Sequence, residues 1–223
     1  MSVFPPRPVD PEVFFEESVP ALFAEVVLQD AERDLELKVG VVLISGDEEG
    51  RGGEWTLSLR AGELNVVVGR SPDCDLTIVQ RVADWRSALW EGRPGLIADV
   101  VATMISAGPE ALRPPGSHSP DGHPEALRGL SELRGLIEAV IADDTEDVED
   151  WKIGIHLGGG PIPETPQATI RLGAEQAEAI RRGELHPVEA LITGQLRLEG
   201  DLGLILQLQA VAMLTASPRS TAG

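Results

Sequence analysis

Apolar and polar residues alternate along several short stretches of the chain. The clearest stretches are 55–59 and 151–157, where every second residue is apolar, and the same pattern returns at Leu196 and Leu198. A period of two is typical of a half-buried β-strand. Shorter apolar runs predict further strands at 39–44, 64–68, 75–79 and 168–172. The four strands expected before residue 80 are joined by short turns containing Gly and Asp, which predicts an antiparallel meander.

Other stretches have the 3.6-residue period of an amphipathic helix. Asp10 and Pro11 are a cap and a first-turn proline, so a helix is expected to begin there. Residues 82–91 have apolar positions at helical spacing, and Gly92 is expected to end that helix. Further helices are expected at 96–105 and 174–182. One more helix is predicted after residue 125 from an apolar stripe of Leu127, Leu130, Leu133, Ile137, Val140 and Ile141.

The stretch from residue 183 to 214 combines several of these signals. Gly183 is a plausible residue just past a helix end, and Pro187 can open a short helix over 188–193. After the strand at 195–199, Gly200 forms a turn and Asp201 can cap the next helix. Residues 202–214 contain only two strongly polar side chains, both glutamines, so this terminal segment is strongly apolar.

The order of these elements repeats within the chain. Residues 55–59 match 151–155, Thr77-Ile78 matches Thr169-Ile170, and the helix ending at Gly92 matches the one ending at Gly183. We therefore expect two related units, residues 1–107 and 125–216, joined by a Pro/Gly/Ser-rich linker at 108–124 and followed by a disordered tail at 217–223. The first unit lacks a final strand and Gly-Asp turn, and the second lacks two early strands. The units are expected to complete one another in one composite body.

Charge and composition exclude several classes of protein. The formal net charge is −19, from 37 acidic and 18 basic residues. Nucleic acids and anionic membranes attract clustered Lys and Arg, so neither is an expected partner. Cys74 is the only cysteine, so no disulfide can form within the chain. Prolines interrupt the N-terminal segment where a signal peptide needs an apolar core, and no apolar run approaches the ~20 residues of a membrane span. A cytoplasmic, acidic protein without stable membrane insertion is expected.

Catalytic and metal-binding motifs are not recognisable in the sequence. The nucleophile elbow and the Walker A loop are both missing. The acidic run at 143–150 lacks the glycine and glutamate spacing of an EF-hand loop. His118, His123, His156 and His186 are not grouped with cysteines, and the alternation of residues 151–157 predicts that His156 points to water. Cys74 lies between two aspartates, which argues against a thiolate nucleophile. We therefore expect no catalytic residue, no metal and no cofactor.

Two sets of these residues resemble the sterol carrier protein 2 (sterol-binding domain) family. The first set is Trp55, Leu57, Leu59, Gly62, Asp75, Thr77 and Gly92, and the second is Gly183, Pro187, Ala190, Gly194, Leu196, Gly200 and Asp201. The resemblance implies an α+β fold, a mainly antiparallel β-sheet covered by helices, here as two degenerate tandem units. It also implies an apolar tunnel that holds an acyl chain, a sterol or a similar lipid.

The resemblance implies non-catalytic binding or carrying of a hydrophobic small molecule, such as a fatty acyl, sterol or isoprenoid lipid. The alternative is a structural or interaction module of the same fold, which carries no ligand and oligomerises or docks a protein partner through its C-terminal apolar segment. The candidate tunnel residues are apolar and come from the predicted strands and helices: Trp55, Leu57, Leu59, Trp85, Ile153, Ile155, Leu157, Ile170, Leu191, Leu196, Leu198, Leu204, Leu206, Leu208, Val211 and Met213.

Overall fold

A computed structural model of the 223-residue chain describes residues 4–25, 33–34, 36–46, 50–95, 132–143 and 149–207. Several expected features lie outside these ranges. They are the helix at 96–105, the linker at 108–124, the tail at 217–223, and the apolar residues Leu127, Leu130, Leu208, Val211 and Met213.

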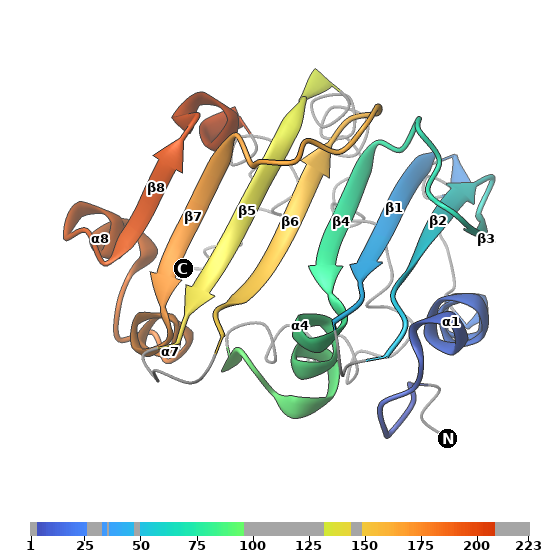
Figure 1. The fold of residues 1–223 in the computed structure, drawn as a ribbon, viewed down its shortest axis with the longest axis horizontal. Coiled ribbons are helices and arrows are strands. Elements are labelled where there is room, and N and C mark those ends of the chain that lie inside the picture. The colour runs from blue at the N-terminus through green and yellow to red at the C-terminus, as the bar shows by residue number, and fades with distance from the viewer. Residues whose placement is uncertain are drawn as a thin grey trace, which may run out of the picture.

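The described strands form one continuous eight-stranded sheet in the order β3-β2-β1-β4-β6-β5-β7-β8 (Figure 1). The sheet is mainly antiparallel and carries helices, which confirms the expected α+β fold class. The strands are β1 (Leu37–Ile44), β2 (Gly53–Arg60), β3 (Glu63–Val68), β4 (Leu76–Arg81), β5 (Gly135–Ala142), β6 (Trp151–Leu157), β7 (Ala168–Gly173) and β8 (Leu196–Gly200).

Two neighbouring pairs of strands run parallel, so the expected meander is only partly right. The strands β1, β2 and β3 do form an antiparallel meander, with Ala61-Gly62 at its second turn. The next strand, β4, instead crosses to the other side of β1 and pairs with it in parallel, with Val41 opposite Ile78. Turn residues specify a local reversal of the chain but not which strand a later segment joins, so this crossover could not be predicted from the turns.

The same strand arrangement occurs twice in the sheet. In the first half β1 lies between antiparallel β2 and parallel β4, and in the second half β5 lies between antiparallel β6 and parallel β7. The halves join where β4 pairs with β6, with Ile78 opposite Ile155. Through this pairing β6 gives the first half a strand beyond β4, and β4 gives the second half a strand beyond β6. The topology is what two mutually completing units would produce, while their boundaries at residues 107 and 125 stay predictions.

Helices flank the sheet, and several begin or end at the residues expected. Pro11 opens a continuous helical segment made of α1 (Pro11–Val13), the π-helical turn η1 (Phe14–Ser18) and α2 (Val19–Ala24). A second segment consists of α4 (Val82–Arg86) and the π-helical turn η2 (Ser87–Glu91), and Gly92 follows it. In the second half, α7 (Ala174–Arg181) ends before Gly183 and α8 is Pro187–Ile192. A last described helix covers residues 202–207, and its Leu204 amide donates to Asp201 Oδ1 at 3.1 Å, as expected of a cap.

The helix predicted from the stripe of Leu133, Ile137, Val140 and Ile141 is wrong. Residues 135–142 are strand β5, which lies between β6 and β7 in the sheet. Buried residues occur on both faces of this strand, including Ile137 and Val140. A strand buried on both faces loses its polar alternation, and its apolar residues can then imitate helical spacing.

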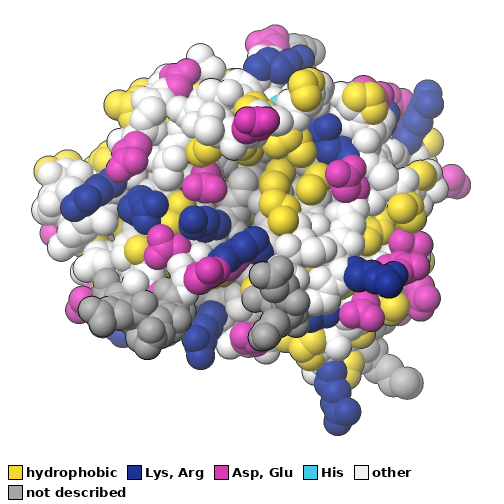
Figure 2. All heavy atoms as spheres, in the orientation of Figure 1, with side chains coloured by type: hydrophobic (Ala, Val, Ile, Leu, Met, Phe, Trp, Pro, Cys, Tyr) yellow, Lys and Arg dark blue, Asp and Glu magenta, His cyan; other side chains and the backbone are white. Residues whose placement is uncertain are grey.

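Charged side chains of both signs are interspersed over the face of the molecule in Figure 2, and apolar side chains gather near its upper middle. No large single-sign basic patch occupies this view. Within the described ranges, no helix is long and apolar enough to cross a membrane.

Candidate functional site

One face of the sheet is apolar across all eight strands. Residues that lie opposite one another in adjacent strands share a face, and the series Trp55, Val41, Ile78, Ile155 and Ile137 runs across the sheet on this side. The series continues through Ala168 on β7. Every other strand residue on this side is apolar or glycine, with Gln80 as the one exception among the described strands. We call this side the apolar face.

Aromatic side chains from the helices fill the first half of the apolar face. Phe14 and Phe15 from η1 and Trp85 from α4 pack with Trp55, Val41 and Leu43 in one buried cluster. The rings of Phe15 and Trp55 stack with centroids 4.9 Å apart, and Phe14 meets Trp85 edge-on at 5.3 Å. Aromatic contacts of this kind stabilise a densely packed core. The candidate residues Trp55, Leu57 and Trp85 therefore belong to a filled core in this half, and Leu59 on the same strand as Trp55 is also buried.

The second half of the apolar face is lined by aliphatic side chains, many of them only half-buried. Leu157, which is fully buried, and Leu204 belong to one cluster, with Ile155, Ile170 and Leu198 packed at its edge. Trp151 belongs to a second cluster at the other end of the strands, with Ile153 and Leu196 at its edge. Most of the predicted tunnel residues of this half are thus brought together on one face.

Two predicted tunnel residues do not join these clusters. Leu191 on α8 is 43% exposed, and Leu206 on the last described helix is 61% exposed. That helix instead turns Leu204 and Ile205 toward the sheet. Leu208, Val211 and Met213 lie outside the described residues.

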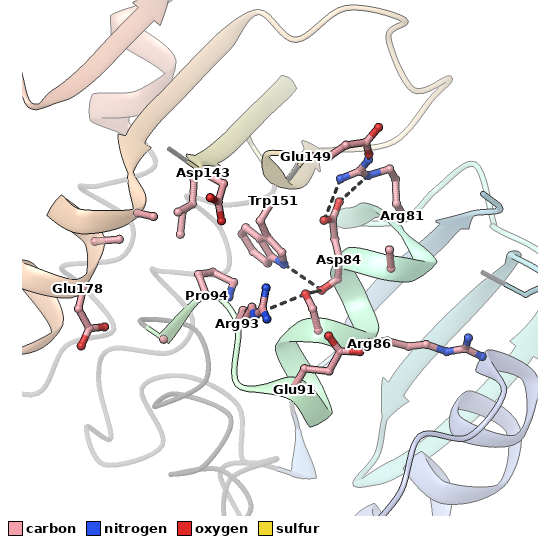
Figure 3. A pocket seen from close by; sticks show the side chains of 16 residues that line it. Arg81, Asp84, Arg86, Glu91, Arg93, Pro94, Asp143, Glu149, Trp151 and Glu178 are labelled. Carbon is pink, nitrogen blue, oxygen red and sulfur yellow. Dashed lines mark hydrogen bonds and ion pairs between the residues drawn. The ribbon is translucent and has the colours of Figure 1, made fainter. Parts of the chain in front are cut away.

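A hollow of about 730 Å³ lies between α4–η2 and α7 (Figure 3). Its apolar lining includes Ile141 and Trp151 from the apolar face and Ala177 from α7. In Figure 3 the Trp151 ring lies beside α4, and Glu178 lies on the α7 side of the open space. The volume falls in the range of about 300–1,000 Å³ that small-molecule sites occupy. Sequence reasoning named Trp151 only as a strand residue, because the walls come from segments far apart in the chain.

Paired charges form the rim of this hollow beside β4. Arg81 holds the buried Asp84 with two hydrogen bonds, Nε to Oδ2 at 2.8 Å and Nη2 to Oδ1 at 3.0 Å. Arg81 also contacts Glu149 and donates to the Asp150 carbonyl at 2.9 Å. The Trp151 indole Nε1 donates to the Asp84 carbonyl at 2.9 Å, so β6 of the second half is tied to α4 of the first. Such a two-bonded pair fixes geometry as well as charge.

Gln80 is a buried polar residue whose side-chain amide nitrogen the fold leaves unsatisfied. The side chain is 6% exposed, and its amide Nε2 has no hydrogen-bond partner. An unpartnered buried donor costs about 1–3 kcal/mol in folding stability. The sequence indicates that Gln80 shares a strand face with Leu76 and Ile78, because the three residues alternate along one strand. The strand register was needed to show that this face is otherwise apolar across the sheet.

The opposite face carries a polar cluster where the two halves meet. Arg70 Nε donates to Thr77 Oγ1 at 2.8 Å, and its Nη2 donates to the Gly160 carbonyl at 2.8 Å and lies 3.3 Å from His156 Nδ1. His156 is buried, so the expectation that it points to water is wrong. Its strand is central in the sheet, and Arg70 from a distant turn reaches across to it. Burial lowers the pKa of His156, and the nearby charges of Arg70 and then Arg134 lower this pKa further.

This pKa predicts a pH-dependent stability. A histidine with a lowered folded-state pKa binds fewer protons when folded than when unfolded, so its contribution to stability is complete above the unfolded pKa of about 6.5 and is lost as pH falls below it. The slope from this single group is at most ~1.4 kcal/mol per pH unit. His156→Asn keeps an acceptor for Arg70 but cannot titrate, and chemical unfolding between pH 5 and 7.5 is expected to show a shallower dependence than in the wild type.

The matched control is His186→Asn, because His186 is exposed at the start of α8 and asparagine also caps helices well. This variant is expected to keep the wild-type pH dependence. Asp73 titrates well below the tested window, since hydrogen bonds from Lys38 and then Ser71 lower its pKa to about 2. Equal slopes for His156→Asn and the wild type would contradict the assignment.

Cys74 and the acidic residues form no metal-binding group in the described ranges. The Cys74 thiol is buried, and burial raises its pKa, partly offset by the charge of Arg70. The sequence argument attributed such a rise to the neighbouring aspartates, whereas burial is the larger cause. Within the described ranges, no three His, Cys, Asp or Glu side chains are grouped to hold a metal ion.

Comparison with known protein families gives a match for the second half of the sheet and not for the first. The sequence profile of the SCP-2 sterol transfer family matches residues 120–213, which include β5 to β8, α7 and α8. No curated protein matches the chain. A sterol carrier protein 2 like 2 from Aedes aegypti is 23% identical, with 52% of this chain and 98% of that chain covered and a TM-score of 0.29. A sterol carrier protein domain 2 of Helicoverpa armigera is 16% identical, covering 52% and 87%, with a TM-score of 0.31.

The first half of the sheet lies outside the family match, so its membership in a tandem pair stays a prediction. The second half carries the expected strand, helix and Gly-Asp turn in the expected order, and it is this half that the family profile covers. Residues 120–213 of this chain are thus similar to the SCP-2 sterol transfer family.

Proposed function

We propose that the protein binds and carries a hydrophobic small molecule, of the fatty acyl, sterol or isoprenoid class, without catalysing a reaction on it. The observation that carries this proposal is the apolar face, which is unbroken across both halves except at Gln80. The family match supports it, because the profile covers the half whose apolar face is lined by half-buried aliphatic side chains. One cysteine and an acidic composition fit the cytoplasm as the setting.

The proposed ligand lies on the second half of the apolar face. In the first half, stacked rings of Phe15 and Trp55 already occupy the space between the sheet and the helices. In the second half, branched aliphatic side chains such as Ile155, Ile170 and Leu198 are left partly uncovered. The hollow beside Trp151 opens at the end of this same half. Each methylene removed from water contributes about 0.8 kcal/mol, so a long hydrocarbon chain supplies micromolar affinity with few polar contacts.

The test compares two leucines on the apolar face, each half-buried on an edge strand. Leu198 is on β8 in the proposed half, and Leu64 is on β3 in the aromatic half. Replacing either leucine with glutamine puts a polar group on that face, which costs ~1–3 kcal/mol where the group is desolvated. Titration with a fluorescent fatty acid is expected to show about tenfold weaker binding for Leu198→Gln and unchanged binding for Leu64→Gln. Native mass spectrometry of the purified protein is expected to show co-purifying lipid.

Binding of no probe by a folded, lipid-free wild type would rule the carrier function out. If both substitutions weaken binding of the fluorescent fatty acid equally, the protein is still a carrier, but its ligand does not lie specifically on the second half of the apolar face.

The alternative is a structural or interaction module that has no ligand. Two sets of exposed apolar side chains favour it: Leu202 and Leu206 on the last described helix, and Val188, Leu191 and Ile192 on α8. Exposed apolar patches often mark protein contacts. In that case the purified protein is lipid-free and forms an oligomer or a complex that Leu206→Asp in the C-terminal apolar segment disrupts, whereas a carrier keeps its lipid affinity in this variant because Leu206 is exposed.

A further inference from the structure

Gln80 differs from every other buried polar residue in the described ranges. Thr56 bonds the Gly69 carbonyl and the Ser71 amide, and Thr77 accepts from Arg70. Asp84 is held by Arg81, and His156 lies against Arg70. The Gln80 amide Nε2 is buried without a partner, whereas Arg86, whose Nε is also buried, bonds Asp10 through its Nη2 at 3.2 Å. Nearly all buried polar groups in folded proteins are hydrogen-bonded, so a side-chain amide nitrogen without a partner needs a physical explanation.

The position of Gln80 places this amide on the surface proposed to hold the ligand. Its partner on β1 is Leu43, and the residues that share its face on β4 are Leu76 and Ile78. On the neighbouring strand β6, the residues of this face include Trp151 and Ile153. Gln80 therefore stands at the junction of the aromatic half and the aliphatic half. An apolar residue here would continue the face without any unsatisfied group.

The hollow is not lined by Gln80 itself, but its wall begins at the next residue of the chain. The residue after Gln80, Arg81, lines the hollow together with Ala83 and Trp151. A chain-like molecule that covers Trp151 and extends along the apolar face toward β4 would meet the Gln80 side chain. Among the described strand residues of the apolar face, Gln80 is the only one whose side chain can form a hydrogen bond with such a molecule.

We propose that Gln80 is the polar anchor of the ligand, and that the ligand is a lipid with a neutral oxygen, a hydroxyl or an ester carbonyl, that accepts a hydrogen bond from Nε2. This inference rests on the proposed carrier function. It assigns the ligand class more narrowly, because no lysine or arginine lies on the described strands of the apolar face to balance an ionised group. Burying a carboxylate there without a counter-charge is unfavourable, whereas a neutral acceptor satisfies the amide.

The test uses Gln80→Met, which keeps a similar volume and removes both polar atoms. Binding of dodecan-1-ol and of dodecane is measured by displacement of a neutral probe, the methyl ester of a fluorescent fatty acid, from wild type and variant. The variant is expected to bind dodecan-1-ol about fivefold more weakly, the loss typical of one hydrogen bond, and to bind dodecane at least as well as the wild type. The matched control Gln195→Met changes an exposed glutamine beside β8 and is expected to alter neither affinity.

The ligand-free protein gives a second, independent measurement. Removing an unpartnered buried amide is expected to raise the melting temperature of Gln80→Met above that of the wild type. A lower melting temperature would mean that the protein itself satisfies Gln80, which would overturn the anchor role. Equal losses for dodecan-1-ol and dodecane would also overturn it while leaving the carrier function intact. If the wild type binds neither compound and no fluorescent fatty acid, the carrier function fails and the anchor with it.

Discussion

Residues 1–107 and residues 125–223, expressed as separate polypeptides, are each expected to lack a cooperative unfolding transition, and mixing them is expected to restore one. The reason is the pairing of β4 with β6, which joins the two halves in the middle of the sheet. Separation would leave each of these strands as an open edge, with unpaired backbone groups along a largely apolar segment. The fully buried Thr77 and Leu157 lie on these two strands and would become exposed.

Side chains on both faces add to this junction. On the polar face Arg70 of the first half bonds the Gly160 carbonyl and contacts His156 of the second. On the other side the Trp151 indole donates to the Asp84 carbonyl, and Leu76 packs against the cluster that contains Leu157. Separation of the halves removes all of these contacts at once. If the two halves depend on one another, the stabilising free energy lost with these contacts exceeds the ~5–15 kcal/mol that stabilises a typical domain, and neither half folds alone.

The measurement is calorimetry or circular dichroism of each polypeptide, alone and mixed. The control is the intact chain with a protease site placed in residues 108–124, the segment predicted to be a linker, which is expected to keep its transition after cleavage. A cooperative transition for either half alone, near the melting temperature of the whole chain, would instead show two independently stable domains.

The sequence located most strands because they are half-buried. Residues 55–59 and 151–157 keep a strict alternation, and both are strands in the sheet. The failure occurred at β5, where Ile137 and Val140 are buried on opposite faces and no polar side marks the strand. His156 was misplaced for a related reason. A polar residue on the less apolar face of a central strand looks solvent-facing until a distant side chain, here Arg70, is seen to cover it.

The candidate site was less predictable than the fold. Apolar strand positions identified which residues line one face, but not which part of that face the aromatic residues of η1 and α4 would fill. The hollow between α4 and α7 combines walls from the two halves, and this depends on the β4–β6 pairing. The sequence alone did not single out Gln80, because a glutamine at the end of an apolar strand is common. Only the strand register shows that Gln80 is the one polar side chain on the apolar face of the described strands.

Replacing Gly200 with alanine is expected to destabilise the protein by more than about 3 kcal/mol, because two effects coincide there. Gly200 has φ +82°, in the left-handed region that side chains rarely adopt, and a Cβ atom would lie 2.1 Å from the Gln167 carbonyl oxygen. That oxygen also accepts from the Asp201 amide at 2.8 Å, so it cannot move without breaking the turn. The obstacle is backbone at the start of β7 and cannot rotate away as a flexible side chain would.

The matched control is Gly183→Ala. Gly183 has a similar φ of +72°, but no atom lies within 4 Å of the added Cβ, so only the conformational cost of ~1–2 kcal/mol applies. Chemical unfolding of both variants measures the difference. Because Asp201 caps the helix that carries Leu204 and Ile205 onto the apolar face, Gly200→Ala is also expected to weaken binding of the fluorescent fatty acid, which Gly183→Ala leaves unchanged. Equal destabilisation by the two substitutions would mean that the turn at Gly200 relaxes freely, and the terminal helix would then owe its position to something other than this turn.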